Sequence, residues 1–149
     1  MLGELNETQI NNILLSQAIG RLGCISDKHP YIVPLTYVYD GKDIYGQTHE
    51  GLKLDMMRKN PNVCFQVDLI INMANWQSVI ATGTFQELKG KEAEKAREYL
   101  YNAVLPLMTS STIHTHEHNV SGKVDDSGRV KPVMYKIKIK KKTGRFEKQ

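Results

Sequence analysis

The sequence predicts a mainly β fold, a small antiparallel barrel with flanking helices, as a single domain over residues 1–149. Six or so strand-like runs follow one another, and most are joined by short turns that favour hairpins. Apolar residues recur at helical spacing only near the start of the chain and late in it. A doubly wound α/β fold needs helices between most strands, so this order of elements argues against one.

The first expected element is an amphipathic helix that begins near Thr8. Asn6 or Thr8 can cap it, and Gly20 is well placed to end it. The residues that recur at helical spacing are Ile10, Ile13, Leu14, Gln17 and Ala18.

Two hairpins are expected next, over residues 22–48. Residues 22–26 and 31–39 are strand-like and are separated by a turn at residues 27–30. The run Asp40-Gly41-Lys42 is a strong hairpin signal and leads into a partner strand at residues 43–48.

Pro34 interrupts the longer strand of this pair. A proline removes a donor from the ladder, so it belongs at an edge, at a bulge or where the ladder is broken. A simple bulge is one explanation. The other is that the backbone of residues 33–36 is left free to face a ligand.

A short helix is expected over Leu52–Lys59, stopped by Asn60-Pro61. Arg58 and Lys59 fall in its last turn, where the helix dipole favours cations. Lys53 falls in the first turn, where a cation is unfavourable unless an anion also binds. Backbone N–H groups and a lysine at one place predict a phosphate site.

The rest of the chain supplies more strands and one more helix. Residues 62–68 and 78–88 are strand-like, with a less regular stretch at 72–75, and Gly83 indicates a bulge or a close approach. Residues 108–130 are polar and resemble a long loop, and a last strand follows within 131–148. The second amphipathic helix is marked by Ala93, Ala96, Leu100, Ala103, Val104 and Leu107.

The formal charge of +4 does not predict nucleic-acid binding. Much of the excess lies in the last strand, where Val133, Tyr135, Ile137 and Ile139 alternate with Met134 and three lysines. This alternation places the lysines on a solvated or edge face, and no aromatic residues interleave with them.

The sequence also limits the compartment. No window approaches eighteen consecutive apolar residues, so we expect no membrane span. The N-terminus lacks a basic flank followed by an apolar stretch, which favours a cytoplasmic protein. Cys24 and Cys64 lie in apolar strand-like runs and are expected to be buried, reduced thiols.

Five motifs in order carry a family resemblance: GRLG, YIVPLTYVYDG, a G-x-K-L-D helix start, a K-N-P-x-V strand and SVIATG. In this order and spacing, the chain resembles the flavin-binding split-barrel proteins related to pyridoxamine 5'-phosphate oxidase. The most similar branch includes the 5-nitroimidazole-resistance proteins. The resemblance spans residues 10–88 and returns in the closing YKIKIKKKTGRFEK segment.

The resemblance implies a homodimer with FMN in the groove between subunits. Residues 33–36 would run beneath the isoalloxazine ring, with their backbone bonded to its polar edge. Residues 47, 48 and 53 would hold the phosphate, and residues 76 and 78 would line the next wall. The matching positions are Val33, Pro34, Leu35, Thr36, Gln47, Thr48, Lys53, Trp76 and Ser78.

The chain departs from the family at two places. Nitroimidazole-resistance relatives commonly carry a histidine in an F-H-S-A type run, and here Gly46 stands at that position, with His49 three residues later. The arginine-rich C-terminal substrate signature of pyridoxamine 5'-phosphate oxidase is matched only by Arg145.

The function implied by the resemblance is an FMN-dependent oxidoreductase. A nicotinamide donor, NADH or NADPH, would reduce the flavin, which passes electrons to a small acceptor. One alternative is an FMN-binding protein without turnover, which serves as a store or sensor. Another is a haem-binding member of the same barrel class.

Three histidines, His114, His116 and His118, alternate in the run IHTHEHN. If this segment is extended, the three imidazoles lie on one side and could ligate zinc, copper or haem iron. The alternative is a polar loop whose histidines are exposed to solvent.

Overall fold

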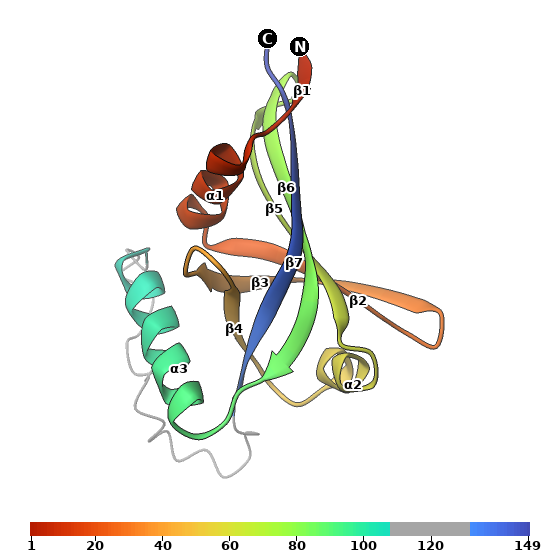
Figure 1. Ribbon diagram of the computed structural model, residues 1–149, viewed down its shortest axis with the longest axis vertical. Helices are drawn as coiled ribbons and strands as arrows, with labels where there is room; N and C mark the ends of the chain where they lie inside the picture. Colours follow the sequence, from red (N-terminus) through yellow and green to blue (C-terminus); the bar gives the residue numbers. More distant parts are fainter. Residues whose placement is uncertain (108–131) are drawn as a thin grey trace.

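The computed structural model describes residues 1–107 and 132–149, which contain seven strands and three α-helices (Figure 1). A short 3-10 turn, Leu105–Leu107, follows the last helix. The elements in chain order are β1 (Leu2–Glu4), α1 (Glu7–Ser16), β2 (Ile19–Ser26), β3 (His29–Tyr39), β4 (Ile44–Thr48), α2 (Leu52–Lys59), β5 (Asn62–Asn72), β6 (Asn75–Glu87), α3 (Gly90–Val104) and β7 (Val133–Glu147).

The strands close into an antiparallel barrel. The order is β1-β7-β4-β3-β2-β5-β6, and β6 also pairs with β7, which completes the circuit. Strand β1 lies outside the circuit and extends the end of β7, where the two chain termini lie side by side (Figure 1). The predicted barrel with flanking helices is confirmed.

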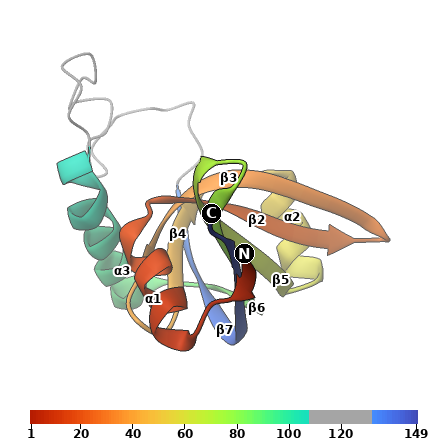
Figure 2. The ribbon, with the colours of Figure 1, turned by 90° about the horizontal axis from the view of Figure 1, so that it is seen from above.

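The core fills the barrel, and helices α1 and α2 both contribute to it. Figure 2 shows these two helices on different sides of the strands, with α3 beside α1. Helix α1 contributes three apolar side chains to this core, and α2 contributes Leu54, Met56 and Met57. Helix α3 packs outside, against β3, β4 and β7, over a second and smaller apolar cluster. The largest fully buried side chains are Tyr37, Tyr135, Phe65, Leu14, Leu22 and Ile44.

Helix α1 starts as predicted but ends four residues early. Asn6 and Gln9 form a reciprocal capping box, with N–O distances of 2.8 and 2.9 Å between each side chain and the other residue's backbone N–H. The expectation that Gly20 ends the helix is wrong, because Gly20 lies inside β2. There it leaves room for the ring of Phe65, which a Cβ at position 20 would overlap.

Strands β2 and β3 form a hairpin with a turn of two residues, Asp27 and Lys28. Both have positive φ, 51° and 66°, as a type I′ turn requires. The turn is therefore shorter than the four residues predicted, and Pro30 already pairs with Ile25 in the ladder.

Pro34 lies at an open edge and not in a bulge. The β2–β3 register runs without a shift from Ile19↔Thr36 to Ser26↔His29. The Tyr37 N–H donates to the Ala18 carbonyl at 3.0 Å, so by alternation Pro34 directs its nitrogen away from β2. On that side β3 pairs with β4 only over Tyr37–Tyr39. The ladder therefore loses no hydrogen bond at Pro34.

Strand β7 is a central strand and not an edge, and Lys138 and Lys140 are exposed on its solvated face, one of the two places expected for the lysines. It pairs with β4 and β1 on one side and with β6 on the other. Met134, on the same face as the lysines, is only 1% exposed, because that end of the face lies beneath α3. Gly83 fulfils its prediction: the β6–β7 register shifts there, and a Cβ would overlap the Lys138 carbonyl.

The remaining boundaries differ in detail. Strands β5 and β6 run on through the stretch that was expected to be less regular and form one long hairpin. Cys24 is buried and Cys64 is exposed, so the prediction of two buried thiols is wrong for Cys64. Cys64 pairs with Gly23 on the outward side of the sheet, whereas its neighbours Val63 and Phe65 face the core. No helix in the described part of the chain is both long and apolar enough to span a membrane.

Candidate functional site

The N-terminus of α2 carries no side-chain cap. Its N-cap residue is Gly51, and the first bond within the helix runs from the Asp55 N–H to the Gly51 carbonyl at 3.1 Å. The N–H groups of the first turn precede this bond and have no acceptor within the helix. Lys53 is half-buried in this turn. The first turn of α2 therefore contains both a lysine and N–H groups without a side-chain cap, and the phosphate-binding role of Lys53 stays a prediction.

Helix α2 packs beside the outer half of the β2–β3 hairpin. Burial raises the pKa of the Cys24 thiol, the nearby Cys64 raises it further, and the positive charge of Lys53 opposes the rise. Leu52, the neighbour of Lys53, lines one pocket with Pro30 and Tyr31, which belong to the part of β3 that has an open edge. A pocket of about 420 Å³ separates α2 from this hairpin and is lined by Ser26, Asp27, His29, Pro30, Tyr31, Leu52, Asp55, Met56 and Lys59.

The four predicted residues of β3 divide between two faces. Val33 and Leu35 are half-buried and pack against the core. Pro34 and Thr36 are exposed on the opposite, outward face. The side chains of this stretch therefore do not all face one ligand, and what the four residues share is the backbone beside the open edge.

The end of β4 is held by β7. Gln47 pairs with Met134 and is half-buried, and Thr48 pairs with Val133 and is 3% exposed. The Thr48 hydroxyl donates to the His49 carbonyl at 3.4 Å. This hydroxyl therefore already has an acceptor in its own loop.

Ser78 belongs to a polar network that was not predicted. Gln66 Nε2 donates to Ser78 Oγ at 2.9 Å and to Asp68 Oδ2 at 3.0 Å. Arg21 Nη1 pairs with the same Asp68 oxygen at 3.3 Å. Because Arg21 also pairs with Pro34 in the ladder, the network links Ser78 to the β3 stretch on one outward face.

Trp76 lies two residues before Ser78 and is also half-buried. Its indole N–H donates to Glu147 Oε2 at 3.1 Å, which ties β6 to the end of β7. The predicted residues thus fall into two groups. Pro34, Thr36, Trp76 and Ser78 share the outward face, whereas Lys53 and the end of β4 lie around α2.

The side chain of Tyr135, the ladder partner of Gly46 on β7, occupies the space beside Gly46. A Cβ at position 46 would overlap the Tyr135 hydroxyl and lie 2.6 Å from Cζ. The phenol therefore takes the space that a side chain would need at position 46, where the family resemblance implies a histidine. Within residues 1–107 and 132–149 the Tyr135 hydroxyl has no hydrogen-bond partner, and burial raises its pKa.

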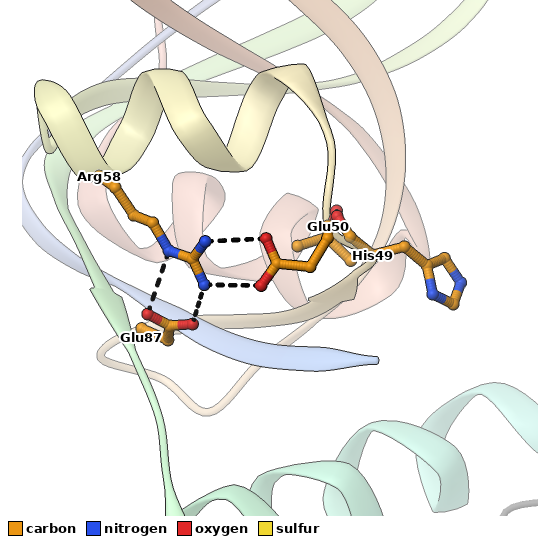
Figure 3. A network of polar contacts seen from close by, with 5 residues as sticks. His49, Glu50, Arg58 and Glu87 are labelled. Atoms are coloured by element: carbon orange, nitrogen blue, oxygen red, sulfur yellow. Dashed lines mark hydrogen bonds and ion pairs between the residues drawn. The ribbon is translucent and has the colours of Figure 1, made fainter. Parts of the chain in front are cut away.

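Sequence reasoning also missed an ion cluster at the other end of α2. Arg58 bonds to Glu50, before the helix, and to Glu87, at the end of β6 (Figure 3). Glu50 and Glu87 lie 8 and 29 residues from Arg58 in the sequence, and the helix dipole alone accounted for Arg58 in the sequence analysis. No local signal in the sequence could have paired them.

The metal hypothesis stays a prediction. His114, His116 and His118 lie outside the described residues. Among the residues that are described, no group of three or more histidine, cysteine, aspartate or glutamate side chains is placed to hold a metal ion.

The closed barrel with its open β3 edge defines the class of protein, a split barrel with flanking helices. The family model described as pyridoxamine 5'-phosphate oxidase matches residues 6–146, and the chain belongs to this family. A curated but uncharacterised protein of Rhizobium meliloti (strain 1021) is 36% identical over 84 residues. That match covers 56% of each chain, so it spans little more than half the length of this relative.

Solved structures share the fold. A FAD-binding protein from Mesorhizobium loti is 26% identical with a TM-score of 0.79, over 100% of this chain and 98% of that one. A candidate 5-nitroimidazole antibiotic resistance protein from Bacteroides thetaiotaomicron is 16% identical with a TM-score of 0.69. The second match covers 98% of this chain and 87% of that one and is a likeness of fold.

Proposed function

We propose that this protein is a flavin-binding oxidoreductase whose cofactor is FMN. In this proposal a nicotinamide donor supplies the electrons and a small molecule accepts them. Membership of the pyridoxamine 5'-phosphate oxidase family and the likeness to a FAD-binding protein of Mesorhizobium loti support a flavin.

The observation that carries the proposal is the uncapped N-terminus of α2 beside Lys53 and the open half of β3. Free N–H groups at a helix start and a lysine fit a phosphate. The open β3 edge has unpaired backbone groups. Because a sheet edge presents both N–H donors and C=O acceptors, it can hydrogen-bond to the polar edge of a planar ring. FMN carries both chemical features.

We assign the remaining contacts by position. The backbone of residues 33–36 would face the ring, and Gln47 and the backbone of Thr48 would approach the phosphate. Trp76 and Ser78 would line the outward wall, where the Gln66 amide holds Ser78 in place. Bound flavin supplies the hydride and electron transfer, and the chain's residues orient it and limit access of water.

The outward face of β3, β2, β5 and β6 supports a homodimer. Five exposed isoleucines occupy outward positions in the ladders, around an apolar groove of about 660 Å³. An exposed apolar surface of this kind favours association, and a second copy of the chain would cover it. The five are Ile19, Ile25, Ile32, Ile70 and Ile80.

The test compares FMN, FAD and riboflavin binding by the wild type and by Lys53→Ala. We expect Lys53→Ala to weaken FMN about ten- to a hundredfold, because a charge-assisted contact contributes roughly 1.5–3 kcal/mol. Riboflavin has no phosphate, so its affinity should change less than about twofold. Lys95→Ala, at an exposed position on α3, is the control. An unchanged FMN affinity in Lys53→Ala contradicts the phosphate assignment.

A second measurement separates an enzyme from a flavin store. Anaerobic NADH or NADPH should bleach the visible absorbance of the bound flavin if the protein accepts electrons from a nicotinamide. A flavin that stays oxidised would favour a storage role. A Soret band in the purified protein would instead indicate haem.

A further inference from the structure

Arg58 binds two carboxylates at once from the last turn of α2 (Figure 3). Its Nη1 and Nη2 lie 2.8 and 2.9 Å from the two oxygens of Glu50. Its Nη2 and Nε lie 2.6 and 3.4 Å from the two oxygens of Glu87. A guanidinium that engages both oxygens of a carboxylate fixes its direction as well as its charge.

The cluster joins a loop to a rigid strand. Glu87 is paired with Tyr135 in the β6–β7 ladder, so the Glu87 end belongs to the closed barrel. Glu50 lies in the loop between β4 and α2, immediately before the N-cap residue Gly51. Arg58 therefore reaches back along the helix and holds the loop against β6. Figure 3 shows the Glu50 carboxylate turned toward Arg58 and the His49 imidazole turned away from the cluster.

Glu50 is placed so that its carboxylate can interact either with Arg58 or with the N–H groups at the start of α2. A carboxylate next to a helix start is attracted to its free N–H groups and to the positive end of its dipole. Gly51 offers no side chain to occupy those groups. Asp55 is the acidic residue within the first turn, and Glu50 directly precedes the N-cap residue, so without Arg58 the Glu50 carboxylate would be a second anion beside these N–H groups. The hydrogen bonds from Arg58 lower the pKa of Glu50, so the carboxylate stays charged to a lower pH than that of a free glutamate.

We propose that Arg58 is a positioning residue for anion binding at α2, which holds the Glu50 carboxylate away from the helix start. The first-turn N–H groups and Lys53 are then left to an external phosphate. This inference rests on the proposed function, because the phosphate it concerns is that of the flavin nucleotide. Arg58 itself touches neither the phosphate nor the ring.

The test titrates FMN and riboflavin, by quenching of flavin fluorescence, into the wild type and five variants. Arg58→Ala should weaken FMN roughly tenfold and riboflavin less than about twofold, since only FMN presents a phosphate to the helix start. Adding Glu50→Gln to Arg58→Ala should restore most of the FMN affinity, because the competing charge is gone. Glu50→Gln alone should leave FMN affinity within about twofold of the wild type. Lys95→Ala removes an equal charge at an exposed position of α3 and should change FMN affinity by less than about twofold.

Rescue separates positioning from a merely structural role. If Arg58 only stabilises the fold, Arg58→Ala weakens both flavins equally and Glu50→Gln restores neither, which overturns the inference. Arg58→Lys keeps the charge but loses the paired geometry, so it should lie between wild type and Arg58→Ala. This variant also provides the measurement if Arg58→Ala does not fold.

The outcomes also distinguish a failure of the Arg58 inference from a failure of the proposed flavin-binding function. A wild type that binds neither FMN nor FAD overturns the proposed function and, with it, the role of Arg58. A wild type whose FMN affinity depends on Lys53 but not on Arg58 retains the phosphate site and overturns only the positioning role.

Discussion

Strands β7 and β3 are both long, but the barrel uses them differently. Strand β7 pairs with β6 over Tyr135–Glu147, and on its other side with β4 over Val133–Ile137 and with β1 over Arg145–Glu147. Strand β3 is bonded to β2 throughout but to β4 only over Tyr37–Tyr39. The closed side carries tightly fitted contacts, such as Gly46 against Tyr135, and the open side carries exposed residues such as Ile32.

This difference indicates that the closed side of the barrel stabilises the fold, whereas the open side is available for binding. Buried side chains and complete ladders stabilise the closed side, where a change of one side chain disturbs its neighbours. The open half of β3 has prolines at two outward positions, Pro30 and Pro34, where β2 needs no N–H donor. Prolines at an edge hinder unwanted pairing with other strands. The open half of β3 can therefore stay unpaired without removing a hydrogen bond from the β2–β3 ladder.

The largest effect is expected on the closed side, from Phe65→Ala. Phe65 is 0% exposed, and its ring packs edge-on against Tyr37 with centroids 5.1 Å apart. Its truncation should lower the free energy of unfolding by about 3–5 kcal/mol, through lost burial and the cavity left behind. Denaturant unfolding measures the loss. Met73→Ala, at the exposed tip of the β5–β6 hairpin, should change stability by less than about 0.5 kcal/mol. Similar losses for the two variants would contradict the contrast.

A smaller loss is expected from Gly46→His. The new side chain would overlap Tyr135, so it should cost about 1–3 kcal/mol of unfolding free energy through overpacking. Gln47→His places the same side chain one residue later, on the other face of β4, and should cost less than about 1 kcal/mol. Thermal and denaturant unfolding of the two variants compare them directly. Equal stability would show that Tyr135 does not constrain position 46.

The smallest effect on folding is expected at the open side, from Ile32→Glu. Ile32 is 68% exposed, so each subunit should keep its fold, as judged by circular dichroism. Association should be lost, because a charge is placed within the proposed interface. Light scattering after size exclusion measures the mass. Leu15→Glu makes the same change at an exposed site on α1 and should leave the mass unchanged. A wild type that is already monomeric would contradict the proposed homodimer.

Local patterns in the sequence were sufficient for much of the fold. The bounds of α2 were predicted to the residue, because Gly51 and Asn60-Pro61 mark its two ends. The hairpin at Asp40-Gly41-Lys42 was also correct, since a positive φ at Gly41 and the Asp40 side chain make the turn from neighbouring residues. Lys53 could be singled out for the same reason: its place in the first turn depends only on where the helix starts.

Contacts between distant residues could not be predicted in this way. The sequence shows Arg58 in a last turn and Gly46 in a strand, but Glu87 and Tyr135 reach them only when the barrel closes. The central place of β7 and the open half of β3 also depend on which strands meet. By itself the sequence determined the elements, their order and the family they resemble, because turns, caps and periodicity act over a few residues. The tertiary structure alone decided which side of the barrel is closed and what surrounds the start of α2, because these depend on pairings that span the chain.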